Sequence, residues 1–161
     1  MVTKYSIIQY VPNPIADERI NIGAIAFSNS NIKVKFLDNW DRVRLFGMED
    51  ITFLQYFADS MIQSVNQGLL FPGDSDDGTS KYERLNKIVD DWINSIQFTK
   101  ITSYLDTVEN VLEDIAKTHL IEPNNFHKQI TLNQRMSEYA TDANDGKTLT
   151  DVDLLKTAIG S

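Results

Sequence analysis

The sequence predicts an α+β domain: a three- to four-stranded antiparallel meander packed against about three helices, followed by a polar C-terminal tail that ends in a short helix. Residues 5–37 form apolar, β-branched runs separated by turn residues, which is typical of consecutive strands joined by local turns. From residue 50 to residue 119 the apolar residues recur at helical spacing instead. We expect one face of the meander to pack against these helices, because the two apolar surfaces are complementary.

Three strands are predicted, over residues 5–11, 20–27 and 32–37. The first strand is apolar on both faces and is therefore expected at an inner position of the sheet. The third strand alternates apolar residues with Lys33 and Lys35, so it should keep one face in water. Short polar turns separate the strands, and this spacing predicts antiparallel pairing.

Three helices are predicted after the meander, over residues 50–66, 82–96 and 106–119, because each segment carries an apolar stripe at helical spacing. The alternating polarity of residues 98–104 is compatible with a fourth strand. The polar loop 73–80 has the composition of a calcium-binding loop, but its glycine and its last ligand position do not fit that pattern. We interpret it as a loop with an acidic surface.

The chain changes character near residues 120–125, where a polar segment with few apolar residues begins. This change predicts an α+β domain over residues 1–122 and a C-terminal extension over residues 123–161. Within the extension, residues 150–159 combine a capping-box spacing with one apolar stripe and predict a short helix. A helix of this length is marginal alone, so it must dock on its own domain or on a partner.

Composition narrows the classes of protein to consider. The 161 residues, 42% hydrophobic and 24% charged, are ordinary for a globular domain. The formal net charge of −8 and the lack of a basic run argue against general nucleic-acid binding. Cysteine is absent, which suits a reducing compartment, and no segment has the length and apolarity of a signal peptide or a membrane span. We therefore expect an acidic cytoplasmic protein without membrane association.

Polar residues between the first two predicted strands form the candidate functional site. Burying such hydrogen-bonding side chains unpaired costs about 1–3 kcal/mol each, so they must pair with one another, with the backbone or with a ligand. Alternation places Arg19 and Asn21 on the same face of the second strand, and the neighbouring strand supplies Gln9 and Tyr10. The candidate ligand- or partner-binding residues are Gln9, Tyr10, Glu18, Arg19, Asn21 and Gly23.

Two interpretations of this group remain open. As a binding site, the Arg19 guanidinium and the Asn21 amide would hold a phosphate, a carboxylate or a peptide backbone, with Gly23 letting the ligand approach closely. As a structural group, Glu18 would tie down the preceding loop, Asn21 would satisfy backbone carbonyls, and Gly23 would mark a bulge or a tight packing point. We favour the structural interpretation.

Common catalytic and nucleotide-binding motifs are absent from the sequence. Neither His119 nor His127 has a set of further metal ligands at helical or strand spacing. Carboxylate pairs on the predicted helices are adjacent in sequence and so point in different directions. We predict no catalytic residues, no cofactor and no metal site.

The opening of the chain resembles a known protein family. Residues 5–13 read Tyr-Ser-Ile-Ile-Gln-Tyr-Val-Pro-Asn, and residues 18–27 read Glu-Arg-Ile-Asn-Ile-Gly-Ala-Ile-Ala-Phe. This pattern is similar to the start of the bacterial domain-of-unknown-function 3037 family, although Gln9 stands where that family more often has Arg. The pair Phe98-Thr99, ahead of a helix, is similar to the second half of the family, so the resemblance covers residues 4–120.

The resemblance implies an intracellular bacterial protein and supplies no catalytic residues, because the family has no established activity. Members are sometimes encoded beside HipA-like serine/threonine kinases, which implies a protein partner of that kind. We therefore favour an interaction or regulatory module over an enzyme. The alternative is a small enzyme or ligand-binding protein that recognises an anionic small molecule through Glu18, Arg19 and Asn21.

Overall fold

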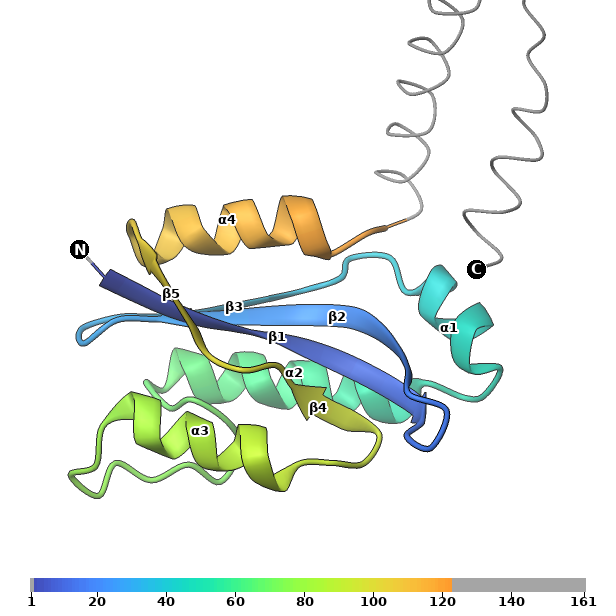
Figure 1. Ribbon diagram of the computed structural model, residues 1–161, viewed down its shortest axis with the longest axis horizontal. Coiled ribbons are helices and arrows are strands. Elements are labelled where there is room, and N and C mark those ends of the chain that lie inside the picture. Colours follow the sequence, from blue (N-terminus) through green and yellow to red (C-terminus); the bar gives the residue numbers. More distant parts are fainter. Residues whose placement is uncertain (1, 123–161) are drawn as a thin grey trace, which may run out of the picture. The chain divides into compact units, whose positions relative to one another are not determined.

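The computed structural model describes residues 2–122 of the chain. Within this range a five-stranded antiparallel sheet combines with four helices, which confirms the predicted α+β class (Figure 1). The predicted C-terminal extension, 123–161, and its short helix near 150–159 lie outside the described residues. The elements are β1 (Val2–Asn13), β2 (Glu18–Phe27), β3 (Ile32–Phe36), α1 (Asp41–Gly47), α2 (Thr52–Asn66), α3 (Lys81–Asp91), β4 (Ile96–Phe98), β5 (Thr102–Leu105) and α4 (Val108–His119).

The sheet has the order β3-β2-β1-β4, and β5 also pairs with β1. The first three strands form the predicted meander, with Ile7 opposite Ala24 and Ile25 opposite Val34. On its other edge, β1 pairs with β5 near its start and with β4 near its end. The apolar first strand therefore holds the inner position that its two buried faces predict.

The segment predicted as one fourth strand is split into two short strands. Between them, Thr99 takes part in the ladder. Its side-chain hydroxyl oxygen accepts a hydrogen bond from the Ile7 amide at 2.8 Å, and its main-chain carbonyl accepts one from the Ser6 hydroxyl at 2.6 Å. The chain then leaves β1 and returns at Thr102. Ile101 is buried in the same core as Phe98, three residues earlier, so the simple alternation expected over 98–104 was wrong.

Helices cover both faces of the sheet: α2 and α3 pack on one face and α4 packs on the other (Figure 1). The expectation that all three predicted helices pack on one face is therefore wrong for the last of them, α4. The physical reason lies in β1 and β2, where Ile8 points into the core under α2 while the adjacent Ile7 points toward α4. Ala24 and Ala26 on the α4 face leave room for the helix to lie close to the strands.

The predicted helix over 82–96 ends earlier, at Asp91. Trp92 has extended backbone dihedral angles, and its ring packs between Phe57 and Phe98 with centroid distances of 5.7 and 5.5 Å. The apolar residues after Asp91 continue the helical spacing, but they belong to the α3–β4 loop and to β4. Packing against distant residues has overridden the local helical pattern here. No helix within the described residues has the length and apolarity needed to cross a bilayer.

Candidate functional site

Three of the predicted site residues form a chain of hydrogen bonds across β1 and β2. The Oε1 atom of Gln9 accepts from the Arg19 guanidinium at 2.8 Å, and its Nε2 donates to the Asn21 Oδ1 atom at 2.9 Å. Asn21 Nδ2 in turn donates to the main-chain carbonyl of His119, at the last residue of α4, at 3.0 Å. Arg19 also forms an ion pair with Asp17 of the β1–β2 turn. These side chains connect the hairpin to the end of α4.

The alignment of Gln9 with Asn21 depends on a β-bulge. Ile8 pairs with Gly23 and Gln9 pairs with Asn21, so Ile22 is an extra residue in β2. At Gly23, an added Cβ would lie 2.6 Å from the Phe36 ring. Gly23 therefore marks a tight packing point beside the bulge, as the structural interpretation predicts, and the space next to it is filled by an aromatic side chain.

The remaining predicted residues lie apart from this network. Tyr10 is fully buried on the opposite face of the sheet, under α2, and its hydroxyl donates to the Glu49 carboxylate. Burial, followed by the hydrogen bond and the negative charge of Glu49, raises the Tyr10 pKa well above its usual range. The Glu18 side chain is exposed and makes no hydrogen bond or ion pair within residues 2–122.

The network leaves limited capacity for an anionic ligand. Arg19 directs three of its five N–H donors to Asp17 and Gln9. Both polar ends of the Asn21 amide are also occupied. Recognition through Glu18, Arg19 and Asn21 stays a prediction, and the contacts favour a structural role for Arg19 and Asn21.

The structure contains a buried ion pair that the sequence did not predict. Asp74 and Arg84 approach to 3.0 Å between Oδ1 and Nε, with side chains only 2% and 9% exposed. The second carboxylate oxygen of Asp74 accepts from the Leu70 amide at 2.9 Å, and Arg84 donates to the Thr79 carbonyl at 2.9 Å. The loop interpreted as an acidic surface therefore buries its first aspartate, which anchors the loop beneath α3. No local spacing relates Asp74 to Arg84, so the pattern carried no signal for this pair.

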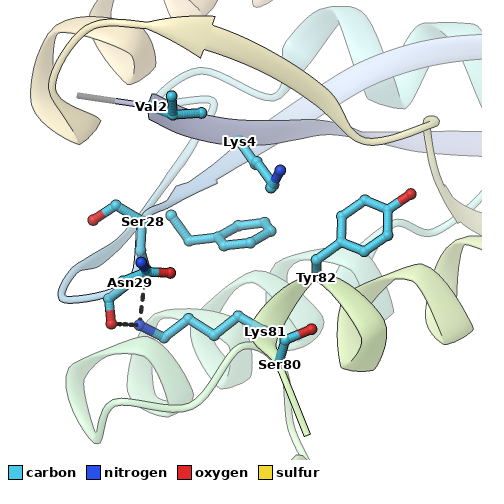
Figure 2. A pocket seen from close by; sticks show the side chains of 8 residues that line it. Val2, Lys4, Ser28, Asn29, Ser80, Lys81 and Tyr82 are labelled. Atoms are coloured by element: carbon cyan, nitrogen blue, oxygen red, sulfur yellow. Dashed lines mark hydrogen bonds between the residues drawn. The ribbon is translucent and has the colours of Figure 1, made fainter.

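The described residues also enclose a pocket of about 440 Å³ (Figure 2). It lies between the start of β1, the β2–β3 turn and the start of α3. The lining residues are Val2, Lys4, Phe27, Ser28, Asn29, Ser80, Lys81 and Tyr82.

Two lysines, Lys4 and Lys81, make the lining of this pocket cationic. Lys81 Nζ donates to the main-chain carbonyls of Ser28 and Asn29, each at 2.8 Å. Lys4 Nζ lies 5.3 Å from the centroid of the Tyr82 ring, a cation–π distance. Burial and the neighbouring Arg84 lower the Lys81 pKa from its usual value. Sequence reasoning missed both lysines because they come from distant segments, which meet only in the folded chain.

Large apolar side chains are exposed at the other end of the sheet, which we call the turn end. It comprises the β1–β2 turn, α1, the α1–α2 loop, the start of α2 and the α3–β4 loop (Figure 1). Met48, Tyr56 and Leu45 are 88%, 75% and 72% exposed. A second, smaller group of exposed apolar residues lies where β1 pairs with β5. The exposed large apolar residues of the turn end are Ile15, Leu45, Met48, Phe53, Tyr56 and Ile93.

Comparison with known proteins gives a family without an assigned role. The model of the family described as "Protein of unknown function (DUF3037)" matches residues 5–120, so the chain belongs to the DUF3037 family. No curated protein and no solved structure matches the chain.

Proposed function

We propose that this member of the DUF3037 family is a protein-interaction module whose partner docks on the turn end. The observation that carries the proposal is the exposure of Met48, Tyr56 and Leu45 at that end. Methionine and aromatic residues are enriched in the cores of protein interfaces, and aromatic side chains bury a large area at low entropic cost. Removing such side chains from water on binding would be favourable in proportion to the apolar area covered.

The turn end presents these side chains on a firmly packed base. The buried Tyr10 ring makes an edge contact with Phe53, at 6.0 Å between centroids and an interplanar angle of 73°. Gly47 lies so close to Tyr10 that an added Cβ would overlap the ring. Met48 follows in the left-handed conformation, with φ of 53°, and closes α1 by donating its amide to the Arg44 carbonyl. Such preorganisation lowers the entropic cost of binding.

The charges of the turn end indicate the chemistry of the partner. Exposed acidic residues occur on the elements of this region: Glu18 in β2, Asp50 before α2, and Asp90 and Asp91 at the end of α3. A partner with an apolar surface and a basic rim would be complementary to this arrangement. The resemblance to a family whose members are sometimes encoded beside HipA-like serine/threonine kinases makes such a kinase the partner that we propose.

Binding of the purified HipA-like kinase from the same organism tests this proposal. The full chain and the double variant Met48→Asp/Tyr56→Asp are titrated with the kinase by calorimetry. We expect the double variant to bind at least about tenfold more weakly, since each aspartate places a charge in an apolar contact. Circular dichroism should stay unchanged because both side chains are exposed in the free protein.

The variant Lys4→Met is the matched control, since it alters the opposite end of the sheet and should keep the affinity of the wild type. Equal affinity of the double variant and the wild type would contradict the proposal, and so would absence of any complex. A retained anionic metabolite and no kinase binding would support the alternative, a ligand-binding protein or a small enzyme.

A further inference from the structure

The pocket at the start of α3 holds cationic side chains in a protein that is acidic overall. Figure 2 shows Lys4 projecting from β1 and Lys81 extending from the start of α3 toward the β2–β3 turn. Within residues 2–122, neither lysine forms an ion pair with a carboxylate. Asp76, the acid whose charge acts on Lys81, is itself paired with Arg84 at 3.3 Å.

The hydrogen-bond capacity of the two ammonium groups is incompletely used. Each lysine ammonium has three N–H donors. Lys81 directs two of them to the carbonyls of Ser28 and Asn29, which leaves one donor. Lys4 makes no side-chain hydrogen bond within the described residues and contacts only the Tyr82 ring through its charge. Four donors and two positive charges therefore remain for a ligand or for water.

A structural role explains part of this arrangement. Lys81 satisfies two carbonyls of the tight β2–β3 turn and so holds that turn against α3. In the described part of the chain, the Lys4 ammonium makes no comparable hydrogen bond, and it approaches only the exposed Tyr82 ring. The charge on Lys4 is thus the feature that the fold alone does not explain.

The size and lining of the pocket define the class of ligand. A volume of about 440 Å³ lies within the range of small-molecule sites and is far larger than one phosphate ion. The hydroxyls of Ser28 and Ser80 add hydrogen-bonding groups, and Phe27 and Tyr82 add aromatic surface. Two ammonium groups suit a doubly charged phosphate, and aromatic surface suits a flat organic group.

We propose that this pocket binds a phosphate monoester of roughly nucleotide size, with the phosphate held by Lys4 and Lys81 and the organic part lying against Tyr82. This site is separate from the proposed partner surface at the turn end. Either proposal can fail without the other.

Titration of the full-length protein with AMP and with glucose 6-phosphate, followed by amide NMR and calorimetry, tests the proposal. We expect shifts centred on the amides of Ser28, Asn29, Lys81 and Tyr82. Adenosine and glucose, which lack the phosphate, should not bind at the same concentrations. Inorganic phosphate should shift the same amides but bind more weakly, because it lacks the organic part.

Variants of Lys4 separate the site from general charge effects. Lys4→Met should weaken binding of the phosphate monoester about tenfold or more, since one charge-assisted hydrogen bond is lost, while Lys4→Arg should keep it. The matched control is Lys117→Met on α4, which removes the same charge from the other face of the sheet and should leave the affinity unchanged.

Three outcomes would overturn the proposal: no binding of either monoester at millimolar concentration, equal affinity of wild type and Lys4→Met, or equal loss in Lys4→Met and Lys117→Met. Lys81→Met is a second variant, and loss of binding in it counts only if its amide spectrum shows an intact β2–β3 turn.

Discussion

Polar side chains have different partners at the turn end and at the opposite end of the sheet. We call that opposite end, where the pocket lies, the pocket end. At the turn end, Arg19, Gln9 and Asn21 bond to one another and to the last carbonyl of α4, and few donors are left. At the pocket end, neither Lys4 nor Lys81 forms an ion pair with a carboxylate in the described part of the chain. The sequence predicts a site at the turn end, yet these two lysines, which lack a carboxylate partner within residues 2–122, lie at the pocket end.

This difference teaches that residue type is a weaker guide to a binding site than unused hydrogen-bonding capacity. Arginine and asparagine look like ligand-binding residues in any sequence, but hairpin pairing gives them partners within the fold. Lysines on separate elements look like ordinary surface charges until the fold brings them to one concavity. Substitutions at each end can test whether it is held together in the way that its contacts indicate.

The largest expected effect lies beneath the pocket end, at the buried pair of Asp74 and Arg84. Arg84→Met should lower the free energy of unfolding by about 3–5 kcal/mol, because it leaves the Asp74 carboxylate buried without its cation. Denaturant unfolding at neutral pH measures this loss. Amide exchange at Leu70, whose N–H binds Asp74, should become faster at the same time.

Arg44→Met is the matched control for this substitution. Arg44 and Asp41 form an exposed ion pair on α1, at 2.8 Å, and its loss should cost less than about 1 kcal/mol. Similar costs for Arg44→Met and Arg84→Met would show that the loop before α3 does not depend on the buried pair.

The fold could be read from the sequence where a pattern is local. The meander followed from period-two alternation and short turns, and α2 followed from an apolar stripe, because both depend on neighbouring residues alone. The face on which α4 packs could not be read in this way, since Ile7 and Ile8 offer apolar surface on both sides. The end of α3 was also missed, because Trp92 continues the helical period but packs between two rings from elsewhere.

The same limit applies to the candidate sites: only contacts between neighbouring segments could be predicted from the sequence. The sequence indicated that the polar group of the hairpin would need partners, and Gln9 did prove to be one of them. It did not indicate that His119, ninety-eight positions away from Asn21, would provide the other. Nor did it indicate the meeting of Lys4 with Tyr82 or of Asp74 with Arg84, since such contacts exist only after the chain has folded.

A smaller effect is expected at the turn end when the network is broken. Asn21→Ala should lower the free energy of unfolding by about 1–3 kcal/mol, because Gln9 and the His119 carbonyl both lose a partner. Arg19→Ala should cost less than about 1 kcal/mol, since its ion pair with Asp17 is exposed. Thermal and denaturant unfolding compare the two variants. An unchanged stability of Asn21→Ala, joined to loss of a bound partner, would reverse our preference and make Asn21 a recognition residue.

A small effect at neutral pH, with a distinct pH signature, is expected at Tyr10 beneath the same end. Tyr10→Phe should cost only about 1 kcal/mol near neutral pH, because Glu49 remains exposed to water when the hydroxyl is removed. The Tyr10 pKa is raised in the folded protein, whereas an unfolded tyrosine ionises near about pH 10. The stabilisation is therefore complete below that pH and is lost as the pH rises toward the folded-state pKa.

Urea unfolding from about pH 9 to about pH 11 measures this loss, which approaches about 1.4 kcal/mol per pH unit for one proton. In Tyr10→Phe this contribution should disappear, so the stabilities of the variant and the wild type converge as the pH rises. Tyr56→Phe is the control, since it removes the same hydroxyl from an exposed side chain. Parallel pH profiles for Tyr10→Phe and the wild type would mean that the ring ionises freely in the folded state, and the firm base proposed for the turn end would then be absent.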